Sequence, residues 1–482
     1  MTSRNHFSSL LGNFLLLAVP AGLLAFFWTM VHFPAVMSVD SFMLVGEAIK
    51  NSYSGQHSPI LGVITRWFIL AFGPRVEILA FTQAFFYFFS GFFLLRTLMS
   101  KSLWALLFAC GLFAAYPPGF VYSVTLWKDV FFVIQLNFLV SFLLHYYRNA
   151  RLLNFFLVWF FLATAIMARH NAILILPALL PAMLLLYKRN PLFLEVSFSR
   201  KILLLCILAT SALPPTLMNK MLGTRPKVFQ NIVFVTMFSE WVTHHRRMGK
   251  PDDPVAKEFW DDALGNIGGH ENLAGKSDSV RLGEAWTFML HLDPDTDNQF
   301  FKVYTEIEGG LPLLLVNFFQ RNPGTVLSYV YGYLKRLTYI DNDNPYWYHM
   351  NVWPENPMEV VAASKFPKFH SLLFQKILPR LYSRGFEKHW IPLLICLISF
   401  AFSLIAFLFS FQTNSYIRNH LPVLLLLPSI CLGYFSGFIV VTAVADWRYL
   451  FPVSSLVYCL LVALFCDGAV QLWNKKVRPF CL

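Results

Sequence analysis

Residues 14–33 read FLLLAVPAGLLAFFWTMVHF, a run that contains no Asp, Glu, Lys or Arg. A helix needs roughly 17–25 mostly apolar residues to cross about 30 Å of hydrocarbon, and this run is long enough. It is also too long for the apolar core of a signal peptide, so we expect it to stay in the mature chain. The run therefore predicts an integral membrane protein.

The rest of the chain has the same character. Hydrophobic residues make up 57% of it and charged residues 13%, and the mean hydropathy is +0.55. This composition excludes an ordinary soluble domain. Apolar runs predict an all-α fold with about ten membrane-spanning helices, each bound being good to about 2–4 residues. The expected spans are 14–33, 77–95, 103–120, 130–146, 152–167, 172–186, 202–217, 390–411, 421–441 and 449–466.

Polar stretches between these runs predict three regions. An N-terminal transmembrane module covers 1–217 and includes a first outer loop at 34–76. A long extracytoplasmic loop region covers 218–388, between the seventh and eighth spans. A C-terminal transmembrane module with a cytoplasmic tail covers 389–482.

The first outer loop contains two expected helices. VDSFMLVGEAIKNSYSG has an amphipathic helical pattern, and HSPILGVITRWFILAFG is apolar but carries Arg66. We expect the second helix to lie along the outer leaflet or to dip into it, rather than to cross the membrane.

The positions of Lys and Arg in short loops set the orientation. With the N-terminus inside, most of these cations are cytoplasmic, and the outer connections between the third and sixth spans hold only Lys128 and Arg169. We therefore expect a multi-pass membrane protein with both termini in the cytoplasm and an outer face toward the periplasm or the cell exterior. The net charge of +12 follows from this asymmetry. It predicts a lipid bilayer as partner and no nucleic acid.

This threading brings polar residues from distant parts of the chain to one outer face. Charge at the ends of membrane segments is costly and often functional. The residues concerned are Asp40, His57, Lys128, Asp129, Arg169, Asn171, Asp446, Arg448 and Tyr449.

Four of these residues, at three places in the chain, have two interpretations. Asp40 either caps the helix that begins there, or is a general base that takes a proton from an acceptor hydroxyl. His57 either marks a helix start before Pro59, or contacts a phosphate or the acceptor. Asp446 and Arg448 form a local ion pair, or bind substrate.

The two outer turns in the first half of the chain are ambiguous in the same way. Lys128 and Asp129 form a surface ion pair of little energetic weight, or Lys128 contacts a phosphate and Asp129 orients it. A tight turn explains Asn171. It does not explain Arg169, a cation on the disfavoured side whose planar group suits bidentate binding of phosphate.

Taken in order, these elements resemble the membrane-embedded C-type glycosyltransferase superfamily (GT-C). Its members carry an acidic residue in the first outer loop, followed by juxtamembrane helices, and Asp40 with its helix matches this. The other matching fragments are His57-Ser58-Pro59, Phe72-Gly73-Pro74-Arg75, Trp127-Lys128-Asp129, Arg169-His170-Asn171, Arg321-Asn322-Pro323, and Arg448-Tyr449 with Pro452.

The resemblance implies that a sugar moves, with inversion, from a polyprenyl-phosphate donor to a glycan or glycolipid acceptor at the periplasmic face. It implies Asp40 as the base, with Lys128, Arg169 and Arg448 stabilising the phosphate as charge develops on it. The length, the span number and the long loop also resemble the glucosyltransferases that decorate O-antigen of lipopolysaccharide in serotype conversion.

The chain departs from the superfamily at one position. Many members carry two adjacent acidic residues in the first loop, whereas Ser41 follows Asp40 here. A second carboxylate is then either Asp129 or absent. We predict no cofactor and no metal ligands, and a divalent metal stays open as an alternative.

Two other functions stay open. A polysaccharide or O-antigen polymerase would also place arginines outside. A transporter or flippase for a lipid-linked sugar would carry charges inside several spans, commonly with inverted repeats. The expected spans have bland interiors and the chain shows no repeat, which favours an enzyme.

Overall fold

The computed structural model describes residues 2–37, 39–53, 59–99, 102–148, 151–189, 210–222, 364–377, 380, 390–408, 415–441 and 450–476. The chain divides into two compact units. The first comprises residues 1–226, 336–438 and 446–482, and the second 227–335 and 439–445. Almost all of the described residues belong to the first unit. They are nearly all helical, and a single isolated bridge between Val36 and Thr125 is their only β-type pairing. The expected all-α architecture is confirmed.

Five of the described helices are long and apolar enough to cross a membrane. The apolar stretches are Phe14–Val31 in α1 (Thr2–Val31), Val76–Leu98 (α4), Lys128–Arg148 (α7), His420–Gly437 in α23 (Ser415–Val441) and Phe451–Val470 in α24 (Phe451–Lys476). These five lie at expected spans.

Four other expected spans coincide with shorter apolar helices. They are α5 (Leu103–Ala114), α8 (Leu152–Ala168), the pair η1 (His170–Leu174) with α9 (Ile175–Arg189), and α22 (Trp390–Leu408). Half of the expected span 202–217 lies outside the described residues, which include 210–217 and there enter α12 (Leu213–Met221).

The expected continuous span over 103–120 is wrong. The structure divides it into α5 and the short α6 (Pro117–Tyr122), with Tyr116 in an extended conformation between them. Proline lacks an N–H and disfavours a helical residue before it, so Pro117 and Pro118 end one helix and begin the next.

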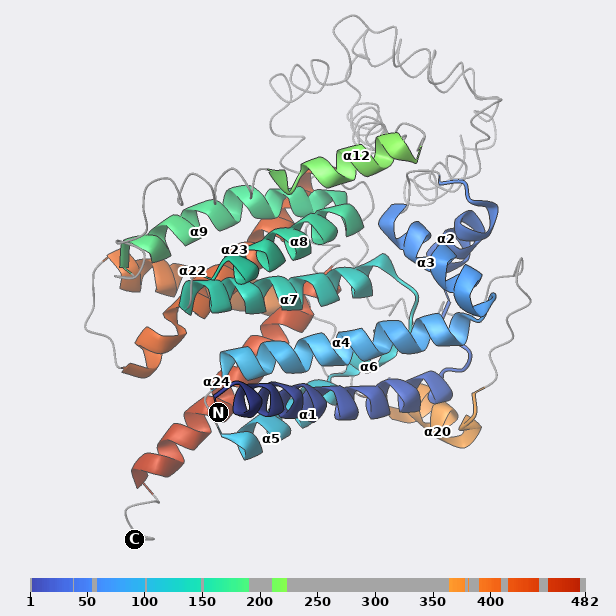
Figure 1. Ribbon diagram of the computed structural model, residues 1–482. Coiled ribbons are helices and arrows are strands. Elements are labelled where there is room, and N and C mark those ends of the chain that lie inside the picture. Colours follow the sequence, from blue (N-terminus) through green and yellow to red (C-terminus); the bar gives the residue numbers. More distant parts are fainter. Residues whose placement is uncertain are drawn as a thin grey trace, which may run out of the picture. The chain divides into compact units, whose positions relative to one another are not determined.

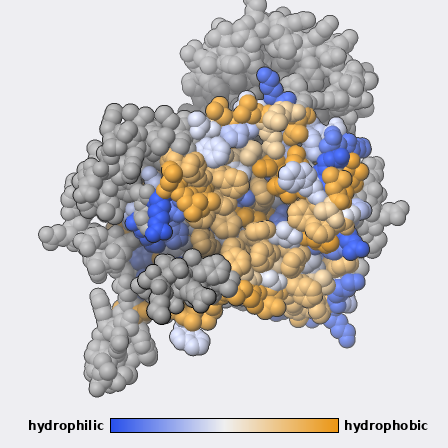
Figure 2. Space-filling view, in the orientation of Figure 1, coloured by the Kyte–Doolittle hydropathy of each residue, from blue (hydrophilic) through white to orange (hydrophobic). Residues whose placement is uncertain are grey.

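The described helices pack side by side, with α1 and α4 antiparallel, α4 and α7 parallel, and α7 and α8 antiparallel. α1 lies along α4, α4 along α7, and α7 along α8, while α24 contacts α4, α5 and α7 (Figure 1). Much of the surface in view is hydrophobic (Figure 2). Trp104 is 81% exposed and Leu153 is 67% exposed. Large apolar side chains on the outside of a helical bundle are what a surrounding bilayer favours.

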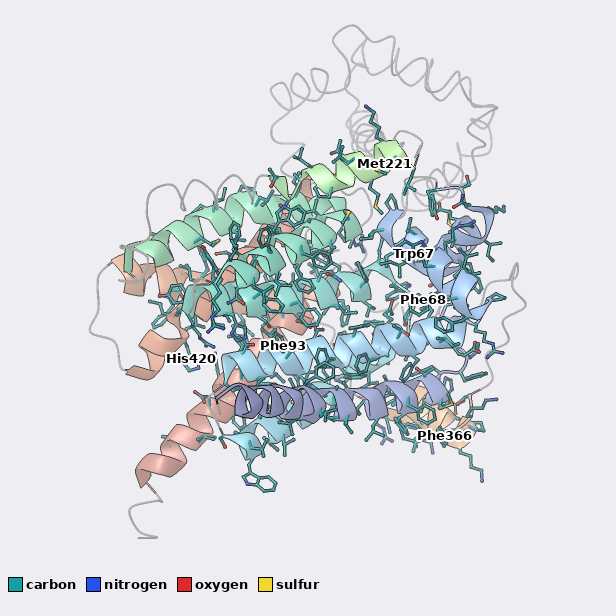
Figure 3. The ribbon with its side chains drawn as sticks, viewed as in Figure 1. Trp67, Phe68, Phe93, Met221, Phe366 and His420 are labelled. Atoms are coloured by element: carbon teal, nitrogen blue, oxygen red, sulfur yellow. The ribbon has the colours of Figure 1, made fainter. Side chains whose placement is uncertain are left out.

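The segment between α1 and α4, expected as a first outer loop, contains a hairpin of two packed helices, α2 (Val39–Lys50) and α3 (Pro59–Phe72). The guanidinium of Arg66 on α3 donates to the carbonyl of Ala48 at 3.0 Å, which satisfies a backbone acceptor at the end of α2. Trp67 and Leu70 of α3 are about two-thirds exposed (Figure 3). Arg66 thus stabilises the hairpin, while α3 presents an apolar side outward.

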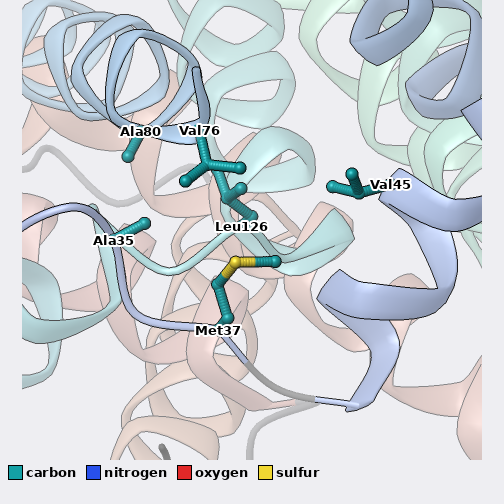
Figure 4. Packing of buried hydrophobic residues seen from close by; sticks show 6 residues of the cluster. All are labelled: Ala35, Met37, Val45, Val76, Ala80 and Leu126. Atoms are coloured by element: carbon teal, nitrogen blue, oxygen red, sulfur yellow. The ribbon is translucent and has the colours of Figure 1, made fainter. Parts of the chain in front are cut away.

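An apolar cluster holds this hairpin to the rest of the bundle (Figure 4). The cluster joins the end of α1, the helix α2, the start of α4 and the residue before Trp127. Its buried members are Ala35, Met37, Val45, Val76, Ala80 and Leu126.

A glycine sets the close approach of α23 to the η1–α9 segment. A Cβ at Gly433 would lie 2.7 Å from the carbonyl oxygen of Leu174 and 3.0 Å from the Cα of Ile175. Both are backbone atoms, so the helices would have to move apart. We expect Gly433→Ala to destabilise the fold by about 1–3 kcal/mol, the usual cost of overpacking. Thermal unfolding in detergent measures it.

Gly111 in α5 provides the matched control. A Cβ there meets nothing within 4 Å, so Gly111→Ala should be neutral or slightly stabilising. Equal unfolding temperatures for the two variants would contradict the close packing at Gly433.

Candidate functional site

The candidate site lies where α1 ends, α2 and α7 begin, and α8 ends. The segment after α1 runs beside the segment before α7. The amide of Val36 donates to the carbonyl of Val124, and the amide of Leu126 donates to the carbonyl of Val36, both at 3.3 Å. The hydroxyl of Ser41 donates to the carbonyl of Leu126 at 3.1 Å. These bonds place the first turn of α2, which contains Asp40, beside the first turn of α7.

The segment before α7 is itself held firmly. The side-chain amide of Gln83 on α4 donates to the carbonyls of Ser123 and Thr125. Trp127 is 2% exposed, and its ring lies 5.1 Å from that of Tyr122. Backbone groups that no helix satisfies are thus paired by a side chain, so the start of α7 is fixed relative to α4.

A buried ion pair forms the centre of the site. The carboxylate of Asp129, in the first turn of α7, binds the guanidinium of Arg169, which follows the last residue of α8. The two side chains are only 2% and 9% exposed. An anion at a helix N-terminus and a cation at a helix C-terminus are each favoured by the helix dipole. The interpretation of Asp129 as the orienter of Lys128 did not include this partner.

Lys128 and Asn171 flank the pair along the chain. Lys128 is half-buried and begins α7. Arg169 has an extended backbone, and its carbonyl accepts the amide of Ala172 at 2.9 Å, which starts the η1 turn that contains Asn171. The turn that was expected around Asn171 is therefore present, while Arg169 has a separate, buried role.

Ser41 stands where many members of the GT-C superfamily carry a second acid. Its hydroxyl is used in the bond to Leu126, and its side chain is fully buried. Within the described ranges, no cluster of three His, Cys, Asp or Glu side chains could hold a metal ion.

Several expected site residues lie outside the part of the chain that the structure describes. These are His57, Asp446, Arg448 and Tyr449, and the side chains of Asp40 and Asn171.

Part of the long loop region returns to the same end of the bundle. The amide of Lys365 donates to the carbonyl of Met30 at 3.0 Å, and its ammonium lies 4.4 Å from the centre of the Phe33 ring. In α20 (Pro367–Leu372), the ring of His370 lies 5.5 Å from that of His32. Residues 364–372 are therefore neighbours of the segment that leads to Asp40.

His32 lies one residue beyond α1 and is 4% exposed. Burial, and to a smaller extent His370, lowers the pKa of His32 to about 3 from its usual 6.5. Between about pH 3 and pH 6.5, His32 is therefore neutral in the folded protein but protonated in the unfolded chain. The contribution of His32 to stability is fully present above about pH 6.5 and falls as the pH drops toward 3.

We expect the wild-type protein to lose about 2 kcal/mol of stability through His32 between pH 7.5 and pH 5, at 1.4 kcal/mol per pH unit below 6.5. Detergent unfolding at the two pH values measures it. His32→Asn should lose this part of the pH dependence. An equal loss of stability in wild type and variant would contradict the neutral, buried state of His32.

Uncharged polar side chains form bonds between helices inside the expected spans. Gln135 of α7 accepts the hydroxyl of Thr164 of α8 at 2.7 Å, and Asn137 of α7 donates to Ser90 of α4 at 3.1 Å. Such bonds between helices are favoured where no water competes. They connect α7 to α4 and to α8 farther along these helices than the candidate site.

A second buried ionisable pair joins α23 and α24. The Nε2 of His420 (Figure 3) lies 3.5 Å from a carboxylate oxygen of Asp467, and the side chains are 8% and 5% exposed. This pair was not predicted, because the expected spans 421–441 and 449–466 stop one residue short of His420 and Asp467. The helices extend beyond the apolar runs. The polar residue at the edge of each run was the sequence feature that could have indicated the pair.

Comparison of the chain with protein-family models, with curated proteins and with solved structures found no match.

Proposed function

We propose that this chain is a membrane glycosyltransferase that moves a sugar from a polyprenyl-phosphate donor to a glycan or glycolipid acceptor. The observation that carries the proposal is the meeting of α2 and α7. The helix turn that contains Asp40 lies beside the turn that contains Lys128 and the Asp129–Arg169 pair. A candidate base and two cations thus occur at one end of an apolar bundle.

The proposed reaction is a single displacement. The oxygen of an acceptor hydroxyl attacks the anomeric carbon, and the bond from that carbon to the phosphate oxygen breaks. The acceptor proton passes to the carboxylate of Asp40, and the polyprenyl phosphate leaves with the bonding electrons. Lys128 and Arg169 stabilise the charge that grows on the phosphate, commonly the largest contribution in such chemistry.

Asp129 has a supporting role in this proposal. A buried carboxylate bound to Arg169 restricts the rotamers of a long side chain. Holding a catalytic cation in one orientation before substrate arrives lowers the cost of the reaction.

The proposed setting is a bacterial inner membrane with both termini in the cytoplasm and the site at the periplasmic face. The positive-inside pattern supports it. At the end of α7 opposite Lys128, the guanidinium of Arg148 donates to the carbonyl of Thr97 at 2.9 Å. O-antigen of lipopolysaccharide is the proposed acceptor class.

The test is transfer in proteoliposomes that contain the purified protein, a set of polyprenyl-phosphate hexoses and O-antigen glycolipid. We expect labelled sugar to reach the glycolipid from at least one donor. Folded protein that transfers none of the hexoses to any acceptor would overturn the proposal.

The His420–Asp467 pair favours a second candidate, a transporter for a lipid-linked sugar. Ionisable residues within membrane segments commonly serve proton relays. This candidate predicts that a pH gradient drives the sugar lipid across proteoliposomes and that His420→Leu abolishes the movement. Movement that is independent of the gradient, or absent, excludes it.

A further inference from the structure

Ser41 connects two parts of the candidate site that are far apart in the chain. It lies in the first turn of α2, next to Asp40, and its side chain is fully buried. Its hydroxyl donates to the carbonyl of Leu126, 85 residues away and two residues before Lys128. The bond therefore joins the turn that contains the candidate base to the segment that leads into the candidate phosphate cations.

Other contacts of the described residues at this junction constrain the position of the first turn of α2 less strictly. Met37, Val45 and Leu126 belong to one apolar cluster, whose attraction is not directional and tolerates sliding. The bridge between Val36 and Thr125 lies before α2 begins. A hydrogen bond weakens steeply when its angle or length changes, so the Ser41 bond sets how the first turn of α2 is placed.

We propose that Ser41 is a positioning residue for the transfer reaction. It holds the turn of Asp40 at a fixed place relative to the start of α7. This inference rests on the proposed glycosyltransferase function, because it assigns Ser41 a task between the base and the phosphate-binding cations. Ser41 itself does not contact the reacting atoms.

Two substitutions separate this task from general packing. Ser41→Ala removes the donor, and Ser41→Thr keeps it. The matched control is Ser403→Ala in α22, because Ser403 is also fully buried and donates to the carbonyl of Ser399 at 2.7 Å within one helix. That control deletes the same kind of bond without touching the site.

The kinetic readout is transfer in proteoliposomes against donor concentration. We expect Ser41→Ala to lower kcat by about 10- to 100-fold, the effect of misplacing a reacting group, with donor KM nearly unchanged. Ser41→Thr should recover most of kcat, and Ser403→Ala should match wild type. An unchanged kcat in Ser41→Ala, or an equal loss in Ser403→Ala, would overturn the proposal.

Hydrogen exchange provides a readout that does not depend on activity. In Ser41→Ala, the amides of Val36 and Leu126 should exchange at least about tenfold faster, since the junction opens more often. If the wild-type protein transfers no sugar, the proposed function fails and exchange alone decides whether Ser41 fixes the junction. Unchanged exchange at both amides then overturns the positioning role as well.

Discussion

Replacing Asp40 with Asn is expected to lower the rate of sugar transfer by at least about 10²-fold, the scale of general base catalysis. The amide keeps the size of the side chain at Asp40, which is the second residue of α2 and so does not cap it. It cannot take the proton of the acceptor hydroxyl. The measurement is transfer from the polyprenyl-phosphate sugar at matched amounts of folded protein.

Glu47 provides the control in the same helix. Glu47→Gln also removes one carboxylate from α2 (Val39–Lys50), and it should leave the rate unchanged. Transfer at the wild-type rate by Asp40→Asn would leave Asp40 as an ordinary residue of the first turn of α2. The mechanism would then lack a base at this position.

The buried Asp129–Arg169 pair leads to the second large effect. Removing either partner leaves an uncompensated buried charge, which commonly costs about 3–5 kcal/mol. We expect Asp129→Leu and Arg169→Leu each to unfold far below the wild-type temperature. Replacing a buried ion pair by two apolar residues is often neutral, so the double variant should regain most of the stability. Thermal unfolding of the three proteins measures this cycle.

Two variants distinguish the effect of the ion pair on sugar transfer from its effect on stability. The double Leu variant should fold but fail to transfer, because no guanidinium is present at the donor site. Arg169→Lys keeps a cation for Asp129 but loses the planar fork, so donor KM should rise about tenfold, a change of about 1.4 kcal/mol. If the double Leu variant transfers sugar normally, the pair is purely structural and the donor site lies elsewhere.

The sequence is sufficient to predict much of this fold. Apolar runs identify helices such as α4 and α7 because a membrane requires length and hydropathy, which a window of residues measures directly. The break at Tyr116 was also predictable, since Pro117 and Pro118 follow it. The extension of α24 past Cys466 was not, because a helix buried among others can continue through polar residues such as Asp467.

Partners across the bundle are harder to predict than helices. The threading placed Asp129 and Arg169 at one face, and consecutive antiparallel helices bring the start of α7 beside the end of α8. Opposite charges at those two ends were therefore a usable signal for their ion pair. The same rule applies to His420 at the start of α23 and Asp467 near the end of α24. No comparable rule connects Ser41 with Leu126, because hydropathy does not specify such a contact.

The pairing of Val36 with Thr125 has a consequence for biogenesis. Membrane helices leave the ribosome in order, so α1, α2 and α3 are made before the segment that binds them exists. The Asp129 carboxylate likewise has no Arg169 until α8 has followed α7. These contacts of the site are therefore complete only after α8 and Arg169 have been made. A chain interrupted before α7 would hold the α2–α3 hairpin without the segment that pairs with it, a state that membrane quality-control proteases can recognise.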